Sequence, residues 1–215
     1  MTPSAVERKR RSEKILEGEA VPFIPHLPVV EDEETAQFRT LDEVVRRAMA
    51  FFTVAARANR FENSRVLEIV DRCRLEHAFT PKEQAFMSDD SPSDHDRVLF
   101  TWRVECCFVL LWALNYFDDI GRPDRTCDVQ RVIKIFTDLS LDGFIRDAKL
   151  RPASEILDAV DLIYRYHWAC RDAALNRRAM PAGLDSGVVM ERHHALNWLV
   201  GYMDRQEWDD VTTDT

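Results

Sequence analysis

The amino-acid sequence predicts an all-α fold, a single-domain multi-helix bundle. Capping signatures of helix starts recur along the chain, whereas the alternation of apolar and polar residues that indicates a half-buried β-strand hardly occurs. The chain of 215 residues has only 6 glycines, which disfavours sheets with many tight turns and glycine-rich phosphate loops. A hydrophobic fraction of 46% and a charged fraction of 31% are ordinary for one globular domain of this length.

Helix starts are marked by side chains that satisfy free backbone N–H groups. Ser4 with Glu7 and Thr40 with Glu43 have the spacing of a capping box, in which a hydroxyl and a carboxylate each accept a hydrogen bond. A proline at the first helical position marks a further start at Pro81. These signatures and the apolar periodicity predict helices at 4–18, 40–59, 64–77, 81–88, 93–117, 128–141, 153–178 and 186–203.

Residues 21–34, "VPFIPHLPVVEDEE", form the main irregular stretch and contain three prolines among several apolar side chains. Because proline disfavours the α conformation of the residue before it, this stretch is predicted to be extended, with a short strand as an alternative. Its apolar side chains indicate that it crosses the core. Residues 1–35 are therefore expected to form a helix followed by a packed Pro-rich arm.

Residues 93–117 form the predicted centre of the bundle. One face of this helix carries Val98 and Trp112, and the opposite face carries Leu99 and Leu110. A helix that is apolar all round must be surrounded by other helices. The remaining helices are therefore expected to pack around it.

Charge and cysteine content disfavour several classes of protein. The formal net charge of -9 disfavours a nucleic-acid partner, because phosphate contacts need clustered Lys and Arg. The basic cluster "ERKRRSEK" near the N-terminus is interpreted as a solvated helix face. The five cysteines include no CxxC, which indicates reduced thiols, and the longest apolar run, 106–114, is too short to span a bilayer. A cytoplasmic protein with no membrane partner is expected.

Arg103 and Glu105 interrupt the central helix on nearly opposite faces, so they cannot pair with each other. An unpaired buried charge costs several kcal/mol, so each is expected to reach a different neighbouring helix. Arg192 lies in the middle of an apolar face of helix 186–203, and we predict that it pairs with a buried carboxylate, first of all Glu105. Structural ion pairs are the main interpretation, and a polar pocket lined by one of these side chains is the alternative.

Helix 153–178 carries a second set of polar residues. Asp161 and Arg165 have the i,i+4 spacing that stabilises a helix, which suits a solvated face or an acidic partner surface for Arg103. His167 falls among apolar residues, and we interpret it as a core histidine with one satisfied N–H. A general base or a metal ligand is the alternative for this histidine.

Glu191 and His194 have the Glu-x-x-His spacing with which ferritin-like bundles hold a metal. The chain has no second Glu-x-x-His, and helical phasing puts Glu191 on a different face from Arg192. Glu191 and His194 are therefore only weak metal candidates, and no cofactor is expected.

Residues 204–215 are expected to form an ordered C-terminal tail. Trp208 and Val211 are spaced i,i+3 like anchors, so Trp208 is predicted to be buried against the bundle. Asp209, Asp210 or Asp214 is predicted to meet arginines.

Several segments together carry a resemblance to one family: "RSEKIL", "HLPVVEDEE", "RTLDEVVRRA", "EILDAVDLIYRYHWACRDA", "ERHHALNWL" and "WDDVTTDT". In this order they resemble a bacterial family known as domain of unknown function 4272, from about Arg8 to the last residue. The resemblance implies one domain over 1–215 and an acidic ending that belongs to the fold. It implies no activity, cofactor or catalytic residue.

Two main functions remain open. The first is a non-catalytic cytoplasmic protein that binds a protein partner, for which the net charge favours a basic one. The alternative is a hydrolase or other enzyme whose pocket, with or without a divalent metal, lies between helices 93–117, 153–178 and 186–203. The candidate residues for such a polar pocket are Arg103, Glu105, Asp161, Arg165, His167, Arg192 and His194. A third hypothesis, a small-ligand sensor, predicts an enclosed apolar pocket lined by Trp102, Trp112 and Trp168.

Overall fold

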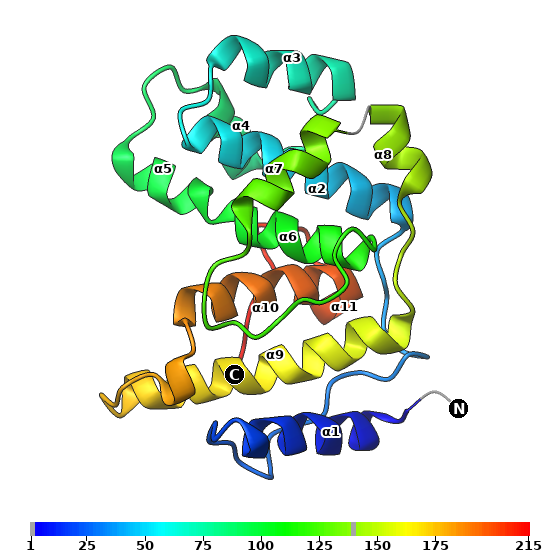
Figure 1. Cartoon of the computed structure of the whole chain (residues 1–215), viewed down its shortest axis with the longest axis vertical. Coiled ribbons are helices and arrows are strands. Elements are labelled where there is room, and N and C mark those ends of the chain that lie inside the picture. The colour runs from blue at the N-terminus through cyan, green and yellow to red at the C-terminus, as the bar shows by residue number, and fades with distance from the viewer. Residues whose placement is uncertain (1–2, 139–140) are drawn as a thin grey trace.

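The computed structural model describes residues 3–138 and 141–215, and within them every regular element is a helix (Figure 1). The predicted all-α fold is therefore confirmed. The end of the helix expected at 128–141 falls on residues 139 and 140, which lie outside the described residues. The elements are α1 (Ala5–Gly18), α2 (Leu41–Ala58), α3 (Asn63–Cys73), α4 (Pro81–Ser88), α5 (Asp94–Thr101), α6 (Arg103–Ala113), α7 (Val129–Asp138), α8 (Leu141–Asp147), α9 (Ala153–Leu175), η1 (Pro181–Gly183), α10 (Ser186–Val200) and α11 (Tyr202–Arg205).

The first helices begin where the capping signatures predict. The Ser4 hydroxyl accepts a hydrogen bond from the Glu7 N–H, and the Glu7 carboxylate accepts one from the Ser4 N–H. Thr40 and Glu43 cap α2 in the same way, and a third box caps α4. Among the helices described, none is both long and apolar enough to cross a membrane.

The predicted central helix, 93–117, is in fact two helices, α5 and α6, which meet at Trp102. Only α6 is enclosed, since every residue from Glu105 to Ala113 is buried. α5 packs against α2 on one side and leaves Val98 and Leu99 exposed on the other. Although α5 itself carries apolar residues on more than one of its faces, other helices do not surround it. The centre of the bundle is α6 alone, with α2 and α10 packed against it.

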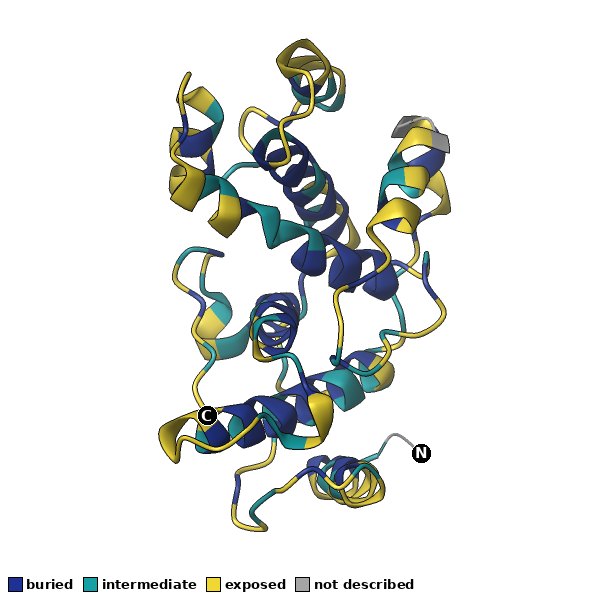
Figure 2. Cartoon of the chain, turned by 60° about the vertical axis from the view of Figure 1, so that its left-hand side comes forward, coloured by how far each residue is buried: buried dark blue, intermediate teal, exposed yellow. Residues whose placement is uncertain are grey.

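The long helices form a stack in the order α1, α9, α10, α6 and α2, in which each helix packs against the next (Figure 1). Figure 2 shows that the inner helices of this stack are largely buried, whereas α1 at its edge exposes one side. α10 lies between α9 and α6, so side chains on both of its faces are buried. Polar side chains of α10 must therefore find partners inside the protein, because water cannot hydrogen-bond to them there.

The connection from α1 to α2 is held against the end of α10. Residues 19–40 contain neither helix nor strand, and the N–H groups of Gln37 and Arg39 donate hydrogen bonds to the carbonyls of Val200 and Leu199 at 3.1 and 2.9 Å. At the same crossing Gly201 has a φ of 70°, and a Cβ there would lie 2.3 Å from the Gln37 carbonyl oxygen. Only glycine fits this close approach of two backbones.

Trp208 is buried against the bundle, as predicted, and only 1% of its surface is exposed. The predicted pairing of Asp209, Asp210 or Asp214 with arginines is wrong. Asp209 accepts a hydrogen bond from the Lys82 N–H at 3.3 Å, and Asp214 accepts one from the Thr212 hydroxyl at 2.7 Å. Within residues 3–138 and 141–215 no arginine is within ion-pair distance of Asp209, Asp210 or Asp214.

Two arginines meet the tail in a different way. The guanidinium groups of Arg47 and Arg103 lie over the Trp208 ring, at 5.3 and 5.4 Å from its centroid. Their carboxylate partners come from helices rather than from the tail, since Arg47 pairs with Glu83 and Arg103 with Glu191. The aromatic face of Trp208, and not the neighbouring aspartates, is therefore what these cations contact.

Candidate functional site

Glu105 and Arg192 form a buried ion pair between α6 and α10, which confirms the predicted pairing. The Arg192 Nε lies 3.2 Å from the Glu105 Oε2, and both side chains are almost fully buried. The Glu105 Oε1 accepts a hydrogen bond from the N–H of Cys127, and the Arg192 Nη1 donates to the carbonyl of Ile120 at 2.8 Å. All of these bonds hold the loop after α6 against α10, so the pair has a structural explanation.

Arg103 also reaches α10, where its Nη1 lies 3.3 Å from the Glu191 carboxylate. The expectation that Arg103 and Glu105 reach different helices is therefore wrong, although Arg103 additionally approaches Glu83 of α4 at 3.7 Å. The placement of Glu191 away from the core is also wrong, because this carboxylate is buried and accepts a hydrogen bond from the Cys106 thiol at 3.1 Å. Since α10 is enclosed by two helices, its second face is as buried as its first.

Asp161 and Arg165 are both completely buried on α9, each with 0% of the side chain exposed. The guanidinium donates two hydrogen bonds to the carboxylate, at 2.9 and 2.7 Å, and a third to the carbonyl of Pro28 at 3.1 Å. The prediction of a solvated face or of a partner surface for Arg103 is wrong here. The physical reason is the connection between α1 and α2, which covers this face of α9 at Pro28.

His167 and His193 form a buried pair between α9 and α10, with their Nδ1 atoms 2.8 Å apart. One of the two Nδ1 atoms must carry the proton that the other accepts. His194 lies elsewhere, with its ring stacked on Trp208 and its Nε2 3.0 Å from the Trp208 carbonyl oxygen. Burial lowers the pKa values of His167, His193 and His194 from 6.5 to about 4, 3 and 4.

These lowered pKa values predict a stability that falls in mild acid. The three histidines stay neutral in the folded protein, whereas unfolding restores pKa values near 6.5, so the unfolded state binds more protons below that pH. The stabilisation is complete above pH 6.5 and is lost as the pH falls toward the folded values. Between pH 7 and 5.5 the free energy of unfolding is expected to decrease by about 1 kcal/mol for each histidine. Urea unfolding at a series of pH values measures this slope.

Two variants test whether the buried histidines cause the pH dependence of the free energy of unfolding. His194→Gln is expected to remove about one third of the decrease between pH 7 and 5.5, because one of three neutral buried histidines is then absent. His77→Gln, at an exposed position, is expected to leave the slope as it is. An unchanged slope for His194→Gln would contradict the assignment.

The two metal candidates are not brought together. Glu191 binds Arg103 and Cys106, whereas His194 binds the backbone of Trp208. Over the part of the chain that the structure describes, no group of three or more His, Cys, Asp or Glu side chains is placed to hold a metal ion.

The seven candidate residues thus divide among separate clusters instead of converging on one pocket. Of the four prominent cavities, none is lined by Glu105, Asp161, His167 or His194, and none by Trp102, Trp112 or Trp168. The predicted enzyme pocket and the predicted tryptophan-lined pocket are therefore not among them. Of the seven candidate side chains, only Arg192 lines one of these cavities, and all seven are bonded to other buried side chains or to neighbouring backbone.

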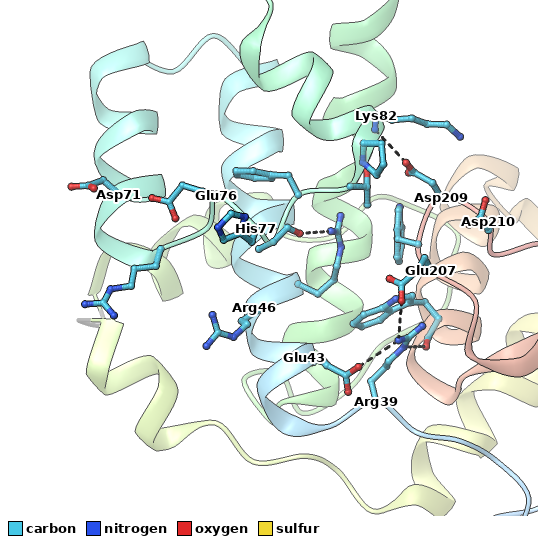
Figure 3. A pocket seen from close by; sticks show the side chains of 18 residues that line it. Arg39, Glu43, Arg46, Asp71, Glu76, His77, Lys82, Glu207, Asp209 and Asp210 are labelled. Carbon is cyan, nitrogen blue, oxygen red and sulfur yellow. Dashed lines mark hydrogen bonds and ion pairs between the residues drawn. The ribbon is translucent and has the colours of Figure 1, made fainter.

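The largest concavity is a charged cleft of about 1250 Å³ that the sequence did not predict (Figure 3). It is formed by the first half of α2 with Arg39 before it, residues 71–82 from the end of α3 to the start of α4, and residues 207–210 of the tail, with Trp198 of α10 beside Trp208. Both tryptophans are buried, so they form its floor. Its charged lining comprises Arg39, Glu43, Arg46, Arg47, Asp71, Arg74, Glu76, Lys82, Glu207, Asp209 and Asp210.

One side of the cleft is internally paired and the other is not. Arg39 lies 3.4 Å from Glu43 and 4.0 Å from Glu207, which joins α2 to the tail. On the opposite side, the side chains of Asp71, Arg74, Glu76 and Lys82 form no ion pair or hydrogen bond with any described residue. Figure 3 labels three of these residues, Asp71, Glu76 and Lys82. Charges of both signs in a concave surface are free to bind complementary groups of a partner.

Fold and cleft together define an all-α protein with a paired polar interior and an open, charged concavity. The family model for the domain of unknown function (DUF4272) matches residues 8–211, and the chain therefore belongs to this family. No curated protein and no solved structure matches the chain.

Proposed function

We propose that this protein is non-catalytic and binds a segment of a partner protein in the charged cleft. The observation that carries the proposal is the cleft itself, which is large, open to solvent and lined by unpaired charges of both signs above two tryptophans. Arginine is among the side chains that most often dominate binding energy at protein interfaces, and Arg46 and Arg74 are exposed in this cleft. The polar residues of the interior, by contrast, already bind one another and are not available to a substrate.

The lining of the cleft indicates the chemistry of the partner. Glu207, Asp209 and Asp210 make the tail side acidic, which suits basic side chains of the partner. Arg74, just after α3, and Lys82, in the first turn of α4, contribute positive charge, so the bound segment carries acidic side chains as well. A polypeptide of mixed charge, bound in the cytoplasm where the five free cysteines stay reduced, fits this lining.

Photocrosslinking in the cells that encode the protein tests this function. A benzophenone amino acid at position 46 or 82, in the cleft, is expected to capture one discrete partner. The same group at position 10, on the exposed side of α1 at the other end of the stack, is expected to capture none. No adduct from either cleft position, or the same adducts from all three positions, would contradict the proposal.

Charge reversal provides the quantitative control. Arg46→Glu combined with Arg74→Glu is expected to weaken capture of the partner at least about tenfold, because like charges then face each other across the interface. Arg10→Glu combined with Lys14→Glu changes the net charge by the same amount on exposed positions of α1. This control pair is expected to leave capture unchanged.

A further inference from the structure

A second cavity, of about 350 Å³, lies between α9, α10, residues 28–31 and the last residues of the chain. Its walls are mainly apolar and include Leu157, Val160 and Val200, all of which are buried to at least nine-tenths. Cavities of this size and character, with a few convergent polar groups, are the usual form of small-molecule sites. No residue of this cavity lines the charged cleft, so the two sites are separate.

His193 lines the cavity, and only one of its two ring nitrogens is hydrogen-bonded to the protein. Only 2% of this residue is exposed, and its Nδ1 is bonded to the Nδ1 of His167. No hydrogen bond joins its Nε2 to the described residues, and this nitrogen is not one of the fully enclosed unpaired polar atoms, so it is accessible from the cavity that the residue lines. A polar atom that opens into a mainly apolar cavity and has no protein partner can bind a polar group of a ligand.

The pair can present either a donor or an acceptor to that group. When His167 donates across the 2.8 Å contact, neutral His193 carries its own proton on Nε2 and is a donor toward the cavity. When His193 donates, its Nε2 is an acceptor. A hydroxyl can satisfy both forms, because it donates and accepts.

The charged part of the lining is entirely acidic. Glu31 and Asp214 contribute largely exposed carboxylates, and among the described residues no lysine or arginine lines the cavity. Tyr202 adds an aromatic ring, whose face attracts cations, whereas the Tyr164 ring already has the guanidinium of Arg165 at 5.9 Å from its centroid. The pKa of Glu31 is raised by partial burial and by the nearby negative charge of Asp204, and the positive charge of a bound cation would counteract this rise.

We propose that this cavity binds a small organic amine with an apolar or aromatic body and a hydroxyl at its far end. The apolar body lies against Leu157, Val160 and Val200. The ammonium group lies between the carboxylates of Glu31 and Asp214, and the hydroxyl binds the Nε2 of His193. This site goes beyond the proposed binding of a partner protein and does not depend on it.

Calorimetric titration of the full chain with three matched probes tests the proposal. Tyramine has the ammonium group, the aromatic body and the hydroxyl, and it is expected to bind most tightly. Phenethylamine lacks the hydroxyl and is expected to bind about three- to tenfold more weakly, the usual effect of one hydrogen bond. 4-Hydroxyphenylacetate carries a carboxylate in place of the ammonium group and is expected to bind at least about tenfold more weakly.

Paired variants locate the site. Glu31→Gln with Asp214→Asn is expected to remove the preference for tyramine over 4-hydroxyphenylacetate. Glu33→Gln with Glu34→Gln removes the same charge from exposed positions outside the cavity and is expected to keep the preference. Equal binding of the three probes, no binding of tyramine up to about 10 mM, or the same loss in both variant pairs would overturn the proposal.

Discussion

Replacing Asp161 by alanine is expected to lower the free energy of unfolding by about 3–5 kcal/mol. The substitution leaves the guanidinium of Arg165 in a fully buried position without its carboxylate. The Pro28 carbonyl remains as a hydrogen-bond acceptor, but it carries no charge to compensate the cation. Urea unfolding followed by circular dichroism measures the change.

Two further variants separate the buried charge from other causes. Asp161→Leu with Arg165→Leu removes both charges, and its loss is expected to be smaller than that of the single variant, since apolar replacements of a buried pair are often tolerated. Asp42→Ala breaks an exposed pair with Arg46, and a change of at most about 0.5 kcal/mol is expected. If Asp161→Ala costs no more than Asp42→Ala, the buried pair does not contribute as described.

Local rules explain which features the sequence could predict. The boxes at Ser4 and Thr40 depend on groups three residues apart, and the structure has both. The pairing of Arg192 with Glu105 followed from a stricter argument. Each charge lay in an apolar helical environment, and a buried charge needs a partner of the opposite sign. Few partners were available, so the sequence nearly determined the pair.

Features that depend on the path of the irregular segments were not predictable in this way. Asp161 and Arg165 have a spacing that is equally suitable for a surface pair, and only the position of Pro28 above them makes the pair buried. Glu191 was misplaced for a related reason, because the phasing of α10 shows that it has two faces but not that both are covered. In each case burial was decided by a segment distant in the sequence.

The charged cleft and the smaller cavity illustrate the same limit at the level of function. Arg46, Glu76 and Glu207 come from three distant parts of the chain, and no spacing rule connects them. The only sequence signal was a high density of charges over residues 71–82, which a solvated loop would also have. The candidate residues were chosen because they are polar at core positions. In the structure their polar groups are bonded to other groups of the protein and stabilise the fold.

Trp208→Ala is expected to lower the free energy of unfolding by about 3–5 kcal/mol, the usual effect of truncating a buried tryptophan. The ring packs edge-on against Phe51 at 4.4 Å and stacks on His194 at 4.2 Å between centroids. Its loss opens a cavity where the tail meets α2 and α10. It also removes the ring over which the guanidinium groups of Arg47 and Arg103 lie. Urea unfolding measures the change.

Two milder variants show whether the tail stabilises the fold through this ring. Trp208→Phe keeps an aromatic ring and loses no hydrogen bond, because the Nε1–H has no acceptor among the described residues, so a smaller loss is expected. Asp210→Ala removes an exposed neighbour, and a change within about 0.5 kcal/mol is expected. A loss below about 1 kcal/mol for Trp208→Ala would mean that the tail rests on the bundle without stabilising it. Because Trp208 also forms the floor of the charged cleft, a large loss implies that the fold and the proposed binding surface depend on the same side chain.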